Sequence, residues 1–141
     1  MGRIMAIDYG IKRTGLAVTD PLGIIASGLD TVETPKLMSY LENYTRRETV
    51  DRFVVGDARH MDNTPSEAAS DVDRFLKQLA KAFPGVPVSL EDERFTSVLA
   101  HRAMIEGGMK AKDRRDKMSV DKISAAIILQ GWLDRNKKEE V

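Results

Sequence analysis

The sequence predicts one domain of the α/β class, in which a mixed sheet is covered by helices. Its 141 residues are the length of a single domain, and 42% of them are hydrophobic, which is enough for an ordinary core. The first third contains three β-rich runs joined by short turn-prone segments, a pattern typical of an antiparallel meander. The remainder alternates helical and extended patterns, and such crossovers require parallel strand pairing.

The opening strands are expected at residues 4–9, 15–19 and 24–32, where apolar runs are separated by turns rich in glycine, proline and aspartate. A helix is expected from Thr34 as its N-cap, because Pro35 suits the first helical position and apolar residues recur behind it at helical spacing. The apolar run at 51–56 ends in a glycine and predicts a buried strand.

The helix from Thr64 has the clearest signals, because Thr64 and Glu67 form a capping box ahead of an apolar stripe. Residues 86–90 alternate as a strand that runs into an acidic triplet. Two further helices are expected, one from about Ser97 to the glycines at 107–108 and one from a Ser119 cap through residue 133. We therefore expect a single domain over residues 1–135 and a charged, frayed tail over 136–141.

The composition excludes several classes of protein. The chain has no cysteine, which removes disulfides, thiol catalysis and Cys-ligated zinc, and two histidines leave protease and zinc-hydrolase sites without most of their parts. No uncharged run approaches the ~18 residues of a membrane span, so we expect a cytoplasmic protein with no membrane partner. Because 22 basic residues balance 22 acidic ones, nucleic-acid binding would depend on a local basic patch.

Acidic residues stand where three of the predicted elements begin or end. Asp8 ends the first strand, the triplet 91–93 ends the last strand, and Asp121 heads the apolar stripe of the last helix. Each has a structural explanation when taken singly, as a turn cap, a solvated strand end or a favourable charge at a helix start. Together they indicate converging carboxylates, and hard oxygen ligands suit Mg²⁺ or Mn²⁺ rather than zinc.

Two basic segments accompany these acids. Lys12 and Arg13 lie in a glycine-containing loop whose backbone could hold phosphate, although the loop is not a P-loop. The second segment consists of Lys110, Lys112, Arg114, Arg115 and Lys117, and Arg94 adjoins the acidic triplet. Solvated loops would explain these charges too, but a basic rim beside an acidic centre is what a nuclease requires.

Four blocks of the sequence resemble the YqgF/RuvX family, bacterial proteins of the ribonuclease H-like superfamily that are related to the RuvC Holliday-junction resolvases. The blocks, in their family order, are 7–18, 54–56 with 61–64, 92–97 and 120–130. The resemblance implies a ribonuclease H-like mixed five-stranded sheet, three antiparallel strands followed by two parallel ones, flanked by helices. It also implies a metal-dependent nuclease that matures the 5′ end of pre-16S ribosomal RNA, or one that resolves branched DNA.

The resemblance also implies the roles of individual residues. Carried over by position, Asp8, Glu93 and Asp121 are the catalytic acids and the ligands of Mg²⁺ or Mn²⁺, with Asp92 as the neighbouring candidate for the second acid. Ser124 stands one helical turn past Asp121, where resolvase relatives carry a further carboxylate. The loop at 57–60 departs from the family pattern, which leaves its substrate contacts open.

The expected partners are nucleic acid, as structured RNA or branched DNA, and pre-ribosomal particles. We expect a monomer or weak homodimer, because the strongest apolar stripes are needed to cover the sheet. Two rival functions remain. Sugar-kinase and actin-like ATPases share a similar phosphate loop, but they enclose the nucleotide between two such domains. A non-catalytic nucleic-acid-binding or assembly factor would keep the fold without turnover, and a cleavage assay with and without Mn²⁺ distinguishes it.

Overall fold

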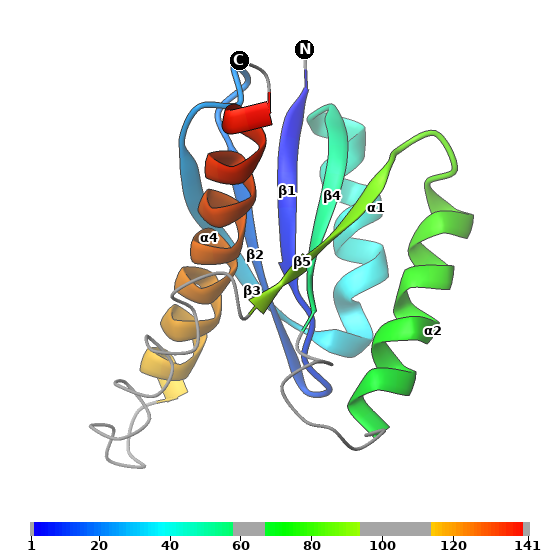
Figure 1. Cartoon of the computed structure of the whole chain (residues 1–141). Coiled ribbons are helices and arrows are strands. Elements are labelled where there is room, and N and C mark those ends of the chain that lie inside the picture. The colour runs from blue at the N-terminus through cyan, green and yellow to red at the C-terminus, as the bar shows by residue number, and fades with distance from the viewer. Residues whose placement is uncertain (1, 58–66, 94–113, 140–141) are drawn as a thin grey trace.

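The computed structural model describes residues 2–57, 67–93 and 114–139, which form a sheet between helices (Figure 1). The strands are β1 (Arg3–Asp8), β2 (Arg13–Thr19), β3 (Ala26–Glu33), β4 (Val50–Asp57) and β5 (Val88–Asp92). The helices are the short 3-10 helix η1 (Thr34–Lys36), α1 (Leu37–Arg47), α2 (Glu67–Ala82) and α4 (Arg114–Glu139).

The five strands form one sheet in the order β3-β2-β1-β4-β5. β1 pairs antiparallel with β2, as β2 does with β3, whereas β1 with β4 and β4 with β5 are parallel pairs. This confirms the predicted mixed sheet of three antiparallel strands followed by two parallel ones. The central strand β1 is buried on both faces, which explains its unbroken apolar run from Ile4 to Ile7.

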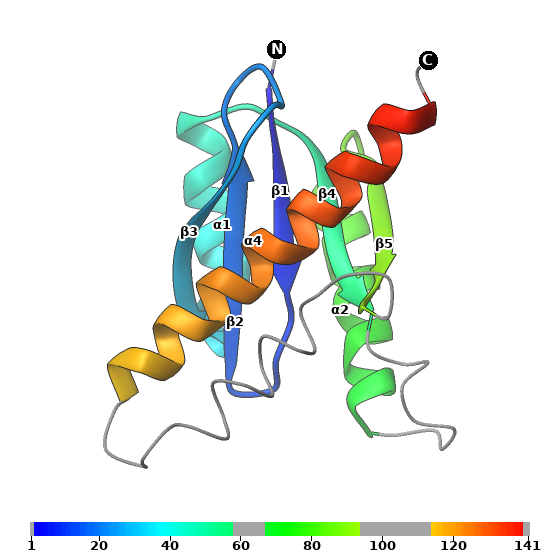
Figure 2. The ribbon, with the colours of Figure 1, turned by 60° about the vertical axis from the view of Figure 1, so that its left-hand side comes forward.

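Two hydrophobic layers hold the helices against the sheet. Met5 and Ile7 of β1 lie in the layer covered by α1 and α2, whereas Ala6 lies in the layer covered by α4 (Figures 1 and 2). Side chains alternate along a strand, so Asp8 shares the α4 face with Ala6. Tyr9, the residue after Asp8, lies on the opposite face, where its ring stacks on Phe75 of α2 with ring centroids 4.7 Å apart.

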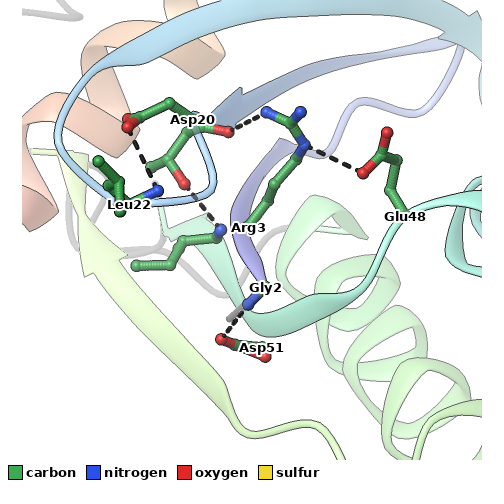
Figure 3. Close-up of polar contacts among 8 residues, drawn as sticks. Gly2, Arg3, Asp20, Leu22, Glu48 and Asp51 are labelled. Atoms are coloured by element: carbon green, nitrogen blue, oxygen red, sulfur yellow. Dashed lines mark hydrogen bonds and ion pairs between the residues drawn. The ribbon is translucent and has the colours of Figure 1, made fainter.

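Polar contacts fasten the end of the sheet that lies opposite Asp8 (Figure 3). Arg3 donates from Nη1 to the carbonyl oxygen of Thr19 at 2.8 Å and pairs through Nε with Glu48 at 3.4 Å. The Asp20 carboxylate accepts three backbone N–H groups of the β2–β3 turn, including that of Leu22. These backbone bonds lower the pKa of Asp20 and fix the turn.

The expected N-cap at Thr34 is wrong. Thr34 begins η1 and makes no side-chain cap; its hydroxyl donates to the carbonyl oxygen of Gly10 at 2.6 Å and lies 3.0 Å from the Thr14 hydroxyl. Its backbone N–H donates to the carbonyl oxygen of Lys12 at 3.0 Å. Thr34 therefore fastens the β1–β2 loop, because that loop offers oxygen acceptors that local helix signals do not reveal.

The last helix is longer than expected. α4 begins at Arg114, five residues before Ser119, so Ser119 is inside the helix and is not its cap. The helix also continues through residues 136–139, where we expected a frayed tail. Both extensions consist mainly of arginine, lysine and glutamate, which have good helix propensity. The domain limits at 135 and 136 stay a prediction.

The buried Phe75 and Leu79 of α2 confirm the predicted apolar stripe of that helix. The capping residue Thr64 and the helix expected from Ser97 lie outside the described residues. Within the described part of the chain, no helix is long and apolar enough to cross a membrane.

Candidate functional site

Asp8 lies at the carboxyl end of β1 between two glycines on the neighbouring strands. On one side it is the register partner of Gly15 in β2. On the other side Ile7 pairs with Val55 of β4, so the next residues along, Asp8 and Gly56, are neighbours. Because glycine has no side chain, α4 and the Glu93 carboxylate can approach the sheet closely on either side of Asp8.

Asp121 fills the space above Gly15. A Cβ atom at Gly15 would collide with the carbonyl oxygen of Asp121 and lie 3.1 Å from its Cβ, so α4 crosses β2 in direct backbone contact. The Asp121 side chain is 23% exposed, and its Oδ2 accepts a hydrogen bond from Nε of Arg13 at 2.9 Å. The expectation that Asp121 faces the sheet is confirmed.

Glu93 approaches the space above Gly56 from the other side. Its side chain follows β5 and is 2% exposed, and its Oε1 lies 3.1 Å from where a Cβ of Gly56 would stand. Glu91 is the register partner of Gly56, and Glu93 lies on the same face of the strand two residues further on. Asp92 pairs with Asp57 and takes the opposite face. The structure therefore brings Glu93, rather than Asp92, to the face that carries Asp8.

Ser124 lies on α4 between the two glycine contacts. Asp121 packs over β2, while Ile128, seven residues later, packs against Gly56 of β4. Residues three and seven positions after Asp121 share its helix face, so Ser124 lies above β1, which runs between those strands. The residue is 1% exposed, and within the described part of the chain its Oγ has no hydrogen-bond partner. A buried hydroxyl of this kind is available to a ligand or an ordered water.

The donor chemistry of this site fits a hard divalent cation. Three carboxylates and an orphaned hydroxyl lie on one face of the sheet near the carboxyl end of β1, and oxygen ligands of this kind suit Mg²⁺ or Mn²⁺. The fit is incomplete in geometry, because the described residues contain no group of three His, Cys, Asp or Glu side chains close enough to hold a metal. Asp121 is paired instead with Arg13.

Glu91 is a buried acid that the sequence pattern does not reveal. It is fully buried and forms an ion pair with Arg135 of α4, while the neighbouring Leu90 is 42% exposed at the sheet edge. Burial raises the pKa of Glu91, and the Arg135 guanidinium opposes that shift. The apolar alternation over 86–90 is confirmed for Val86 and Val88, which pack against the core, and it is wrong for Leu90. The pattern holds no information about a cation 44 residues away that pairs with a buried Glu91.

The basic candidates are placed in two groups. Lys12 is exposed at the β1–β2 loop, and Arg13 begins β2 on the α4 face. The structure assigns Arg114, Arg115 and Lys117 to the first turns of α4 rather than to a loop. Arg94, Lys110 and Lys112 lie outside the described residues.

Comparisons with known proteins agree with the fold and identify the family. The RuvX family model, described as "Holliday junction resolvase", matches residues 2–135. A relative from Christiangramia forsetii is 56% identical over 94% of this chain and 98% of its own length, and one from Parabacteroides distasonis is 55% identical over 97% and 98%. Both carry the name "Putative pre-16S rRNA nuclease".

Among solved structures, T. thermophilus RuvC in complex with a Holliday junction substrate is similar in fold. The TM-score is 0.61 at 21% sequence identity, covering 97% of this chain and 96% of that chain. A further Thermus thermophilus RuvC structure gives a TM-score of 0.59 at 20% identity. The family match over nearly the whole chain and the relatives above 50% identity lead to one conclusion: this chain belongs to the RuvX family.

Proposed function

We propose that the protein is a metal-dependent nuclease that hydrolyses phosphodiester bonds of pre-16S ribosomal RNA during maturation of its 5′ end, in the cytoplasm. The observation that carries the proposal is the gathering of Asp8, Glu93 and Asp121 on one face of the sheet, beside two glycines. The names of the two relatives from Christiangramia forsetii and Parabacteroides distasonis support pre-16S rRNA as the substrate.

The three carboxylates would hold Mg²⁺ or Mn²⁺, with Asp8 in the central position. When bound, such a cation assists hydrolysis by activating water and by neutralising the charge that develops on the phosphoryl group. Hydrolysis adds one water across the bond: an oxygen–phosphorus bond forms, the strand's phosphorus–oxygen bond breaks, and the departing oxygen takes a proton. The buried carboxylate of Glu93 would hold the cation on the face where the reacting phosphate would lie.

Lys12, Arg13 and the basic first turns of α4 would bind the nucleic-acid backbone. Such contacts hold the strand in place without reading its sequence. Lys110, Lys112 and Arg94 lie outside the described residues, and we propose the same role for them from the sequence alone. The position of the cut would then depend on the structure of the RNA or on pre-ribosomal partners, and we propose that the protein acts as a monomer or weak homodimer.

A second candidate function is resolution of four-way DNA junctions. It is favoured by the description of the family model and by the similarity in fold to a RuvC that was solved with a Holliday junction. A resolvase must cut two strands symmetrically, which usually requires a two-fold dimer.

Purified protein with Mg²⁺ or Mn²⁺ tests the two functions side by side on a precursor 16S 5′ segment and a synthetic four-way junction. We expect cleavage of the RNA, loss of cleavage in Asp8→Asn, and an Asp8→Asn fold that is intact by circular dichroism. Paired symmetric nicks in the junction with no cut in the RNA would reverse the order of the two functions. Binding without cleavage of either substrate would make the protein an assembly factor.

A further inference from the structure

The cation beside Asp121 in this structure is an arginine side chain. Arg13 begins β2 two residues before Gly15, on the α4 face, and reaches Oδ2 of Asp121 through its Nε at 2.9 Å. The two side chains are 39% and 23% exposed, so the pair lies at the surface of the site. One oxygen of a proposed metal ligand is therefore occupied by a group that belongs to the chain.

This contact conflicts with a divalent cation at the same carboxylate. Two positive groups that share Asp121 repel each other, and the repulsion is stronger near a protein surface than in bulk water. The described acids also do not form a three-residue cluster that could hold a metal. A divalent cation would bind Asp121 more readily if the Arg13 side chain could leave Asp121 and pair with a second anion.

A nucleic-acid phosphate is such a partner. A guanidinium is planar and matches phosphate oxygens with two parallel hydrogen bonds, which a lysine ammonium cannot do. Arg13 adjoins the exposed Lys12 in the β1–β2 loop. Thr34 holds the backbone of this loop, because it donates hydrogen bonds to the carbonyl oxygens of Gly10 and Lys12. A shift of the loop backbone would break both bonds. The side chain of Arg13 can thus turn while its backbone stays in place.

We propose that Arg13 exchanges Asp121 for a backbone phosphate when nucleic acid binds, so that nucleic acid and divalent ion strengthen each other's binding. This rests on the proposed function, because it takes Asp121 as an ion ligand. Arg13 is then a positioning residue that assembles the ion site only in the presence of substrate. A purely structural role for the pair is less favoured, because α4 already meets β2 in backbone contact at Gly15.

Calorimetric titration of Ca²⁺, alone and with a saturating RNA stem-loop, tests the exchange. Ca²⁺ accepts the same oxygen ligands as Mg²⁺, and a denaturing gel verifies that the RNA stays uncut. In the unmodified protein we expect RNA to raise the affinity for Ca²⁺ by about fivefold or more, the lower range of allosteric coupling between sites. In Arg13→Gln we expect a ratio near one and tighter Ca²⁺ binding without RNA.

Lys12→Gln is the matched control, because it removes the same charge from the adjacent, exposed position. It is expected to weaken RNA binding with and without Ca²⁺ while keeping the fivefold ratio. A ratio that persists in Arg13→Gln, or Ca²⁺ binding by Arg13→Gln no tighter than in the unmodified protein, would overturn the exchange. If the unmodified protein binds no Ca²⁺ with or without RNA, the proposed metal site itself fails.

A double-mutant cycle decides the question if calorimetry shows that Arg13→Gln is poorly folded. The Asp121→Asn substitution releases Arg13. The affinity of the Asp121→Asn variant for RNA, measured without divalent ions, should therefore exceed that of the unmodified protein. Exchange predicts that this gain is lost when Arg13→Lys is added, since a lysine cannot bind phosphate as a fork. An equal gain in both backgrounds would mean that only the removed negative charge matters and would overturn the proposal.

Discussion

Glycine determines how close α4 comes to the sheet. At Gly15 the backbone of Asp121 occupies the space that any other side chain would need, and at Gly56 the space is taken by Ile128 and the Glu93 carboxylate. The neighbours differ in rigidity, because Gly15 meets a helix backbone whereas Gly56 meets the flexible end of an isoleucine. Gly15 is therefore the stricter of the two positions.

Gly15→Ala should lower the free energy of unfolding by about 2 kcal/mol or more, because an added methyl group overpacks a site with no free space. Since a displacement of about 1 Å costs on the order of a hundredfold in rate, cleavage should fall far more than stability. Gly85→Ala is the control, because no atom lies within 4 Å of a Cβ at that position. Urea unfolding and initial cleavage rates check both variants, and equal effects of the two would contradict this packing argument.

Individual site residues were predictable to the extent that local pattern places them. Asp8 at a strand end and Asp121 at the head of an apolar stripe could be read from the sequence, and the structure places both on one face. The choice of Glu93 within the acidic triplet came from the family resemblance. The face of the sheet on which Glu93 lies follows from the register of β5 with β4. The orphaned hydroxyl of Ser124 could not be predicted, because its burial depends on how α4 packs on the sheet.

At the scale of elements, β5 and α4 are joined by one buried ion pair. Glu91 has lost all contact with solvent, whereas its partner Arg135 remains 45% exposed. The two groups therefore differ in how much solvation they lose on folding. Removing the arginine leaves a buried anion without a cation, while removing the anion leaves an arginine that water can still solvate.

Arg135→Gln should cost roughly 3 kcal/mol of stability at neutral pH, because breaking a buried pair from the exposed side strands the buried charge. Glu91→Gln should change stability by about 1 kcal/mol or less, since a glutamine at this position can still accept a hydrogen bond. Urea unfolding of both variants measures the difference. A larger loss in Glu91→Gln than in Arg135→Gln would show that the attraction outweighs the cost of burial.

The same pair predicts a pH dependence. Burial raises the pKa of Glu91 above its ordinary value of 4.5, so its contribution to stability is fully present below that value and is lost as pH rises through the folded pKa. Glu91→Gln lacks this loss. Its stability relative to the unmodified protein should therefore increase between about pH 4 and about pH 7. Parallel unfolding curves at both pH values check the sign, and a relative decrease would contradict it.

The start of α4 has an unfavourable charge for a helix. Arg114, Arg115 and Lys117 lie in its first turns, where the helix dipole disfavours cations. A surface that binds phosphate would compensate for this cost. Replacing Lys112, Arg114 and Arg115 with alanine should weaken RNA binding equally for all sequences and reduce the log–log salt slope by about 2–3. An unchanged slope would mean that these residues do not contact phosphate.

At the scale of the whole molecule, the order of elements carried most of the predictable information. Three strands with short turns and two later strands separated by helices define the mixed sheet, and the structure has that sheet. The limits of α4 and the role of Thr34 were not predictable, because they depend on contacts between segments far apart in the sequence. Local propensity identifies elements better than it identifies their ends.

The acids Asp92 and Glu93 test the central claim most directly, because they are adjacent in sequence and lie on opposite faces of the sheet. The measurement is the initial rate of RNA cleavage by Asp92→Asn and Glu93→Gln, each verified as folded by circular dichroism. The account predicts that Glu93→Gln loses cleavage by at least about a hundredfold, because Glu93 would hold the cation that stabilises the charge developing on the phosphoryl group, while Asp92→Asn stays within about threefold of the unmodified protein. Loss of cleavage in Asp92→Asn with activity retained in Glu93→Gln would contradict the assignment of the catalytic face to α4.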